Sequence, residues 1–214
     1  MGLNLLTTAK ELFIDLLFPA KCVVCQKETE GARKNKLICL GCLKTLSPSL
    51  NFYCPLCEAR SVDGGLCFSC ALISGESKPP LDKLIYPFSY REPAIQKTIK
   101  AFKYRFIKGL ELPLGNLMAS YLKKIKKKID LSGLVLIPVP LHKRKFNQRG
   151  YNQSELIAGR VFEFLKSEHS DAEFFSDTLV KKEKTKDQAD LDVEQRVKNL
   201  KSAFLPIKSV IRHE

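Results

Sequence analysis

The spacing of apolar residues predicts one short amphipathic helix at the N-terminus and two longer helices further along the chain. In residues 1–19, apolar side chains recur at helical spacing up to Pro19, and three charged residues interrupt the run. In residues 92–106 and 114–129, apolar side chains recur every three or four positions on one face, while lysines occupy the other. We expect each apolar stripe to pack against the rest of the protein.

A continuous apolar run at residues 134–139 predicts a strand that is buried on both faces, the kind found in parallel sheets. It is followed by a basic loop at residues 141–150 and by a helix at residues 153–166, which Asn152 can cap. Shorter patterns predict two further strands and a short helix, at residues 84–90, 179–182 and 191–200. This mixture of elements predicts an α/β fold.

All eight cysteines lie in one 49-residue segment and form four CxxC pairs: Cys22/Cys25, Cys39/Cys42, Cys54/Cys57 and Cys67/Cys70. A CxxC turn presents two thiolates on one side, so two such turns complete a tetrahedral site of four thiolates. Four turns therefore predict two structural zinc ions. A segment with few large apolar residues needs such sites, because its own hydrophobic core is too small.

Other uses of paired cysteines fit this sequence less well. A disulfide framework is typical of exported chains, and residues 1–19 lack a basic leader. A thioredoxin-like redox site uses a single CxxC, whereas an iron–sulfur cluster stays open as an alternative. Pairing the cysteines in chain order costs the least loop-closure entropy, and a cross-braced pairing stays open as well.

The composition adds a strong positive charge. The length of 214 residues suits one α/β domain with a small appendage, or two small domains, and the 44% of hydrophobic residues excludes wholesale disorder. Residues 94–150 contain fourteen basic and two acidic residues, and so account for nearly all of the net charge of +13. A face of that sign attracts nucleic acids or phosphate-bearing substrates, and solvated helix faces are the alternative. With no export signal or membrane span, we expect a cytoplasmic protein.

The strand, basic loop and capped helix together predict a phosphate or pyrophosphate site, because a helix N-terminus offers free amide groups beside the basic side chains. A plain crossover loop with lysines facing water is the alternative. The phosphate candidates are Lys143, Arg144, Arg149 and Asn152. The candidates for contact with nucleic acid are Lys97, Lys100, Lys143 and Lys145. We assign no catalytic residue.

Four segments carry a resemblance to a known family: LLFPAKCVVC with the later CxxC pairs, FSYREPAIQKTIKAFKYR, IPVPLHKRKFNQRGYNQSELIA and TKDQADLDVEQRVKNLKSAF. In this order, they resemble the ComF family of phosphoribosyltransferase-like proteins, which are linked to DNA uptake in competent bacteria. The cysteine pairs and the PVPL…RGYNQ stretch are the specific motifs. The resemblance runs along almost the entire chain.

The resemblance implies a double zinc ribbon followed by a Rossmann-like domain of the type I phosphoribosyltransferase kind. The expected division is an N-terminal helix, the double zinc ribbon and the transferase-like domain, at residues 1–19, 20–72 and 81–214. The resemblance also implies Mg²⁺ with phosphoribosyl pyrophosphate as the ligand of a complete site. Its implied partners are single-stranded DNA and proteins of DNA uptake, including helicases.

One feature departs from the family pattern. Members of the family bind phosphoribosyl pyrophosphate through an acidic pair and a Thr-Thr-Gly segment. That element follows a family motif whose residues in this chain are Arg196, Asn199 and Phe204. Residues 205–214 contain no such motif. We therefore expect a domain that lacks its C-terminal strand-loop-helix, and no phosphoribosyl transfer by this chain. The rival hypothesis is a non-catalytic zinc-ribbon module that binds nucleic acid or a partner protein.

Overall fold

The computed structural model describes residues 19–29, 37–74, 81–168, 171–186, 188 and 191–207. The chain divides into two compact units, Met1–Pro113 with Ser120–Ile129 and Leu114–Ala119 with Asp130–Glu214. The helix predicted before Pro19 lies outside the described residues. The domain boundaries stated above stay predictions.

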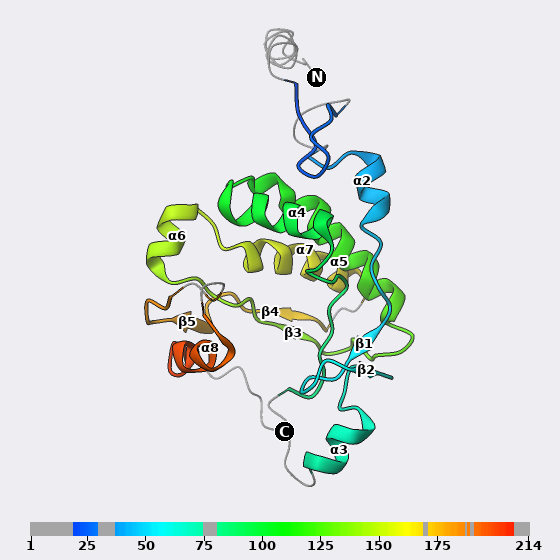
Figure 1. Ribbon diagram of the computed structural model, residues 1–214, viewed down its shortest axis with the longest axis vertical. Coiled ribbons are helices and arrows are strands. Elements are labelled where there is room, and N and C mark those ends of the chain that lie inside the picture. The colour runs from blue at the N-terminus through cyan, green and yellow to red at the C-terminus, as the bar shows by residue number, and fades with distance from the viewer. Residues whose placement is uncertain are drawn as a thin grey trace. The chain divides into compact units, whose positions relative to one another are not determined.

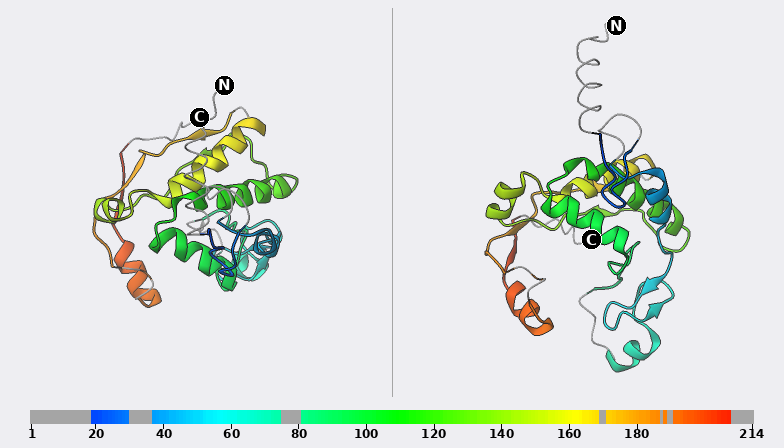
Figure 2. Two further views of the ribbon diagram at one scale, coloured as in Figure 1. Left: turned by 90° about the horizontal axis from the view of Figure 1, so that it is seen from above. Right: turned by 45° about the horizontal axis from the view of Figure 1, so that its top comes forward.

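The cysteine-rich part of the first unit contains two short helices and one small sheet. The helices are α2 (Leu40–Thr45) and α3 (Phe68–Ser74), and the strands are β1 (Phe52–Tyr53) and β2 (Arg60–Ser61). The strands pair antiparallel, with Phe52 opposite Ser61. In Figures 1 and 2, α2 and α3 lie on opposite sides of this strand pair.

Helix α4 (Pro93–Tyr104) confirms the first long helix of the sequence analysis. Proline suits its first turn, where an amide hydrogen has no helical acceptor. Ile95 and Phe102 are buried as the stripe predicts. The prediction that the stripe continues to Phe106 is wrong, because that residue follows the end of the helix at a φ of 54° and is 45% exposed.

Helix α5 (Glu111–Ile125) confirms the second long helix, and it follows a 3₁₀ turn, η1 (Lys108–Leu110). Its C-terminal half forms a core cluster with the second ribbon: Phe52, Tyr121 and Ile125 are buried together, and Ile85, Leu122 and Ile129 pack against them. Phe52 lies two residues before Cys54. Apolar burial therefore holds the second ribbon, the part of the chain that contains Cys54 to Cys70, against α5.

The second unit contains a parallel βαβ arrangement. Strand β3 (Val135–Leu136) pairs in parallel with β4 (Glu173–Phe174), and the crossover contains α6 (Lys143–Arg149) and α7 (Gln153–Glu168). Helix α7 packs on this strand pair, as Figure 1 shows, with the rings of Phe162 and Phe174 stacked at 5.6 Å.

The prediction that residues 134–139 are buried on both faces is wrong. Val135 and Ile137 are each 43% exposed, and Val139 is 57% exposed. Among the described residues, β3 pairs only with β4. A two-stranded pair has an open edge and an uncovered face, so an apolar run can lie in it without being enclosed.

The prediction of a loop at residues 141–150 is also wrong, because most of this segment is helix α6. Lysine, arginine and glutamine are good helix formers. The Nδ1 atom of His142 caps the helix by accepting from the amide of Arg144 at 3.2 Å. Gly150 ends it at a φ of 78°, the left-handed conformation that favours glycine.

The C-terminal part of the second unit is a hairpin closed by a helix. Strands β5 (Leu179–Lys181) and β6 (Phe204–Pro206) pair antiparallel, and α8 (Val193–Leu200) lies between them in sequence. A capping box of Asp192 and Gln195 starts α8. The sequence analysis predicts β5 and α8 correctly.

The strand predicted at residues 84–90 is wrong. Only Leu84 makes a bridge, opposite Tyr53, and the following backbone is irregular around Pro87, which has no amide hydrogen for a ladder. The described strands form three separate two-stranded sheets. The fold is thus a mixture of helices and small sheets, and the Rossmann-like sheet stays a prediction.

The hydroxyl of Tyr121 provides a test of the first unit's core. Tyr121 is 0% exposed, and its hydroxyl finds no hydrogen-bond partner among the described residues. Burial also raises the pKa of this phenol. We predict that Tyr121→Phe increases the free energy of unfolding by about 1 kcal/mol, because it removes a buried unsatisfied group and keeps the ring. Tyr121→Ala should instead lower it by about 3–5 kcal/mol. Urea unfolding measures both changes, and destabilisation by the phenylalanine variant would contradict the prediction.

Candidate metal centres and a cationic pocket

The eight cysteines form two clusters of four thiols, each with its ligand atoms within 4.8 Å of one another. The clusters are Cys22, Cys25, Cys39, Cys42 and Cys54, Cys57, Cys67, Cys70. This is the chain-order grouping that loop-closure entropy favours. The Sγ atoms of Cys25 and Cys39 lie 3.7 Å apart, and those of Cys57 and Cys67 lie 3.6 Å apart. A zinc–sulfur bond of about 2.3 Å gives a tetrahedral edge of about 3.8 Å, so the spacing fits zinc.

The first half of each cluster is a tight turn with the same hydrogen bonds. The amide of Gln26 donates to the carbonyl of Cys22 at 2.9 Å, and the amide of Glu58 donates to that of Cys54 at 3.0 Å. Gln26 and Glu58 both adopt left-handed φ values, 62° and 58°. Neither is a glycine, so the sequence gives no direct sign of this turn.

The second half of each cluster is the start of a short helix. Cys39 precedes α2 and Cys67 precedes α3, and the carbonyl of each accepts the amide four residues later, at 2.8 and 2.9 Å. The Sγ atom of Cys39 also accepts from the amide of Cys42 at 3.4 Å. The two ribbons therefore repeat one module, a turn that supplies two thiols and a helix start that supplies two more.

The environment of the thiols favours a bound cation. Burial tends to raise the pKa of Cys22 and Cys54, but backbone amides outweigh it and lower both values to about 6. Burial and the neighbouring thiols raise the pKa of Cys42 to about 12, and the neighbouring thiols followed by burial do the same to Cys70. Each cluster thus forms its first thiolate readily and resists the last one, because negative charges repel at this distance. A divalent cation removes that repulsion.

The donor set fits structural zinc in both clusters. Four thiolates saturate a tetrahedral zinc ion and leave no position for water or substrate. Each ion would hold a ribbon together and would not take part in a reaction.

The second unit contains a small cationic pocket of about 90 Å³. Arg144 and Lys145 line it from α6, and Lys181 and Lys184 line it from β5 and the residues after it. His142, Gln148 and Thr185 complete the lining. Burial, and then the charge of Lys145, lower the pKa of Lys181, so this ammonium is held among like charges that an anion would neutralise.

The structure gives the other phosphate candidates different positions. Lys143 is exposed on α6 and does not line the pocket. Arg149 donates to the side chain of Gln153, and Asn152 links two segments by donating to the carbonyl of Val139 at 3.1 Å and accepting from the amide of Ser154 at 3.1 Å. Asn152 therefore caps α7 as predicted. Lys181 and Lys184 are absent from the sequence-based candidates, although the basic run at residues 181–186 is visible.

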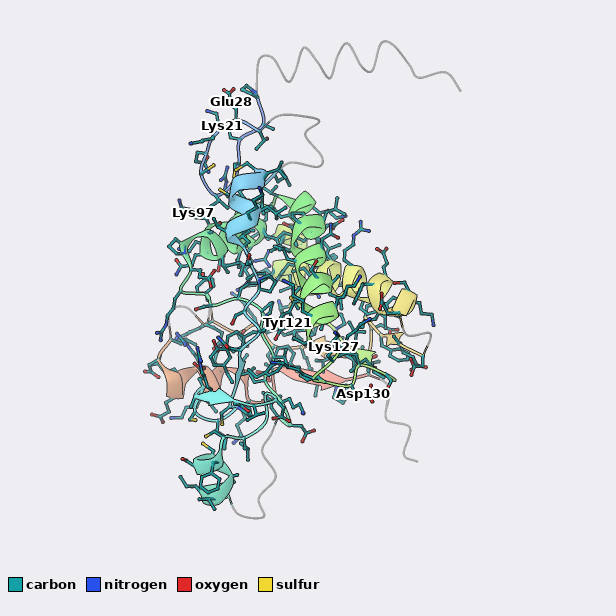
Figure 3. The ribbon with its side chains drawn as sticks, turned by 90° about the vertical axis from the view of Figure 1, so that its right-hand side faces the viewer. Lys21, Glu28, Lys97, Tyr121, Lys127 and Asp130 are labelled. Carbon is teal, nitrogen blue, oxygen red and sulfur yellow. The ribbon has the colours of Figure 1, made fainter. Side chains whose placement is uncertain are left out.

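Two of the nucleic-acid candidates lie on α4. The ammonium of Lys97 donates to the carbonyl of Val24 at 3.0 Å, which ties α4 to the first ribbon (Figure 3). Lys100 is exposed on the same helix. The contact of Lys97 gives this residue a structural role that its position in a basic run does not reveal.

A double zinc ribbon domain model matches residues 13–71. The chain is 25% identical to Competence protein F of Haemophilus influenzae over 189 residues, which cover 87% of this chain and 76% of that protein. It is 22% identical to Competence protein ComFC of Bacillus subtilis over 130 residues, which cover 59% of this chain and 52% of that protein. These matches support a ComF family member.

No solved structure matches this ComF family member. Among its described residues, no helix combines the length and apolar character needed to cross a bilayer. The two relatives and the domain model confirm the resemblance at the level of the family and of the zinc ribbon.

We predict that this ComF protein binds two zinc ions, one in each cluster. Peptides covering residues 17–47 and 48–75 should each bind one zinc ion with four sulfur ligands, because each cluster draws all its ligands from one such segment. Metal analysis of the whole chain, and X-ray absorption of each peptide, measure stoichiometry and ligand type.

Cys→Ser at any of the eight positions should unfold the affected ribbon, because structural zinc contributes roughly 10 kcal/mol or more to the folding of such small domains. The control is Val62→Ser, at a residue that is 93% exposed and is not a zinc ligand. Fewer than two zinc ions per chain, or peptides that bind zinc only when mixed, would contradict the chain-order sites.

Proposed function

We propose that this chain acts in DNA uptake by competent cells as a zinc-ribbon protein that binds the phosphates of single-stranded DNA. The observation that carries the proposal is the cationic pocket, in which side chains from α6 and from the β5 segment converge. The two relatives are named competence proteins, which supports the biological setting. A cytoplasmic location agrees with this role.

The size of the pocket favours one phosphate group at a time. A water molecule occupies about 30 Å³ in the liquid, so about 90 Å³ has room for a single tetrahedral oxyanion. Arginine and lysine bind phosphate by charge and hydrogen bonds, and Gln148 and Thr185 add neutral donors. One such pocket positions a phosphate of a strand without selecting its sequence.

The lysines around the end of α5 do not line this pocket. The lysines at the end of α5, including Lys123, Lys124 and Lys127, are exposed to solvent. Positive charges near the C-terminal end of a helix stabilise it, because they interact favourably with the helix dipole. The same charges add to the long-range attraction of DNA. These lysines therefore provide a control that removes equal charge outside the pocket.

We predict that Arg144→Ala, Lys145→Ala and Lys184→Ala, combined, weaken binding of single-stranded DNA and reduce its salt dependence. Each lost phosphate contact should reduce the slope of log affinity against log salt by about 0.7 for a single strand. Fluorescence anisotropy with a labelled oligonucleotide over a salt series measures both quantities. The control combines Lys123→Ala, Lys124→Ala and Lys127→Ala. Equal losses in both triple variants would show that net charge, and not the pocket, carries the binding.

The second candidate function is binding of phosphoribosyl pyrophosphate with Mg²⁺, as the family resemblance implies. The observation that favours it is Arg149, whose Nε is buried and lacks a hydrogen-bond partner among the described residues. It lies just before the capped start of α7, where free amide groups attract anions. A buried guanidinium nitrogen without an acceptor is one that a bound phosphate would satisfy.

Calorimetry separates the two candidates. Because the pocket holds about one oxyanion, we predict that phosphoribosyl pyrophosphate binds weakly, with little dependence on Mg²⁺, and that no phosphoribosyl transfer occurs. Tight, saturable binding that requires Mg²⁺ and is lost in Arg149→Ala would favour the second candidate. Binding of DNA falls steeply with salt, whereas a site of this second kind depends on Mg²⁺ and much less on salt.

A further inference from the structure

The first unit contains another pocket, and its lining is aromatic instead of basic. It has a volume of about 510 Å³ and is lined by four aromatic residues, Tyr53, Tyr86, Phe88 and Tyr90, together with Glu58, Ser89 and Arg91. This volume lies within the range of small-ligand sites. None of these residues is a zinc ligand or a member of the cationic pocket.

The aromatic rings are arranged for stacking. Tyr53 and Tyr86 are nearly parallel, with an interplanar angle of 8° and ring centroids 4.6 Å apart. Tyr90 is 53% exposed, so much of its surface is available to a ligand. The faces that Tyr53 and Tyr86 turn to each other are occupied, so Tyr90 offers the exposed ring, and an exposed aromatic ring can stack a nucleobase without strong sequence preference.

The two charged residues of the pocket can form hydrogen bonds with the polar edge of a ring. Glu58 can accept hydrogen bonds and Arg91 can only donate them. A nucleobase presents both donors and acceptors at its edge, whereas an isolated phosphate would be repelled by the carboxylate. Aromatic rings beside hydrogen-bond donors and acceptors therefore fit a heterocyclic ring better than an anion or an aliphatic chain.

We infer that this pocket binds a nucleobase, stacked on its tyrosines and hydrogen-bonded by Glu58 and Arg91. The inference goes beyond the proposed function, because the ring and not the phosphate is recognised. Its ligand is the base of a free nucleotide or of a single strand, and both sources present the same chemistry.

The second ribbon holds this pocket in place. Tyr53 precedes Cys54 and Glu58 follows Cys57, so one zinc-binding turn positions both residues. The bridge between Tyr53 and Leu84, and the hydrogen bond from the amide of Leu84 to the carbonyl of Gly64 at 2.8 Å, bring the segment with Tyr86 beside this turn. Gly64 has a φ of 88°, and a Cβ there would lie 3.1 Å from the Leu84 carbonyl oxygen, which explains the glycine.

The test uses the zinc-loaded full chain and 2-aminopurine riboside, a fluorescent nucleoside whose emission is quenched by stacking. The sequence has no tryptophan, and the probe is excited at wavelengths longer than tyrosine absorbs. We expect saturable quenching by the wild-type protein. Tyr90→Ala should weaken binding roughly ten- to a hundredfold, because one stacking ring is lost. Tyr90→Phe keeps the ring and should stay within about twofold of wild type.

The matched control is Tyr104→Ala, which removes a tyrosine that is 62% exposed on α4 and does not line the pocket. Circular dichroism and zinc content establish that each variant is folded. The inference is overturned if the wild-type protein quenches neither the free nucleoside nor the same base placed within an oligonucleotide. It is also overturned by an equal loss in Tyr90→Ala and Tyr104→Ala.

The source of the base, and independence from the cationic pocket, are tested with the same probe. Quenching of the free nucleoside assigns the pocket to free nucleotides, and quenching only within an oligonucleotide assigns it to a single strand. The triple variant of Arg144, Lys145 and Lys184 should weaken oligonucleotide binding and leave any nucleoside quenching unchanged. Failure of the base pocket is thereby distinguished from failure of the phosphate proposal.

Discussion

Four thiolates within 4.8 Å of one another are the constraint on which the N-terminal part of this protein depends. The pKa of about 12 for Cys42 and for Cys70 expresses the cost of completing that negative charge without a cation. Zinc removes the cost and closes each ribbon. Because the ribbons contain few large buried side chains, metal coordination takes the place of a hydrophobic core there.

The two ribbons have the same local design but different surroundings. Both use a turn with a left-handed residue and a helix start to present their thiols. The first is tied to α4 by Lys97. The second places Phe52 in the core with Tyr121, and next to it Tyr53 stacks on Tyr86. One zinc-binding turn thus positions both a core residue and the wall of a pocket.

The positive charges of the chain form a defined cationic pocket only where the fold brings several of them together. Most lysines of residues 94–150 are spread along helix faces, where water solvates them. Arg144 and Lys145 differ because α6 brings them to Lys181 and Lys184. Burial, and then the charge of Lys145, lower the pKa of Lys181 in this pocket. A phosphate gains more from such a group of cations than from a single exposed lysine.

The sequence by itself determined the elements that depend on local spacing. The CxxC pairs indicated how the thiols group, the apolar stripes predicted α4 and α5, and Asn152 marked the start of α7. Ligand turns, helical periodicity and caps all act over a few residues, so a local pattern is enough to predict them. Tertiary structure decided the rest. Whether residues 134–139 are buried on both faces depends on which strands lie beside them. Residues 143–149 could have formed a loop, and they form a helix whose ends are capped by His142 and Gly150. The two pockets join residues that are far apart in the sequence, such as Tyr53 with Tyr86 and Lys145 with Lys181, and no local pattern shows which distant side chains will meet.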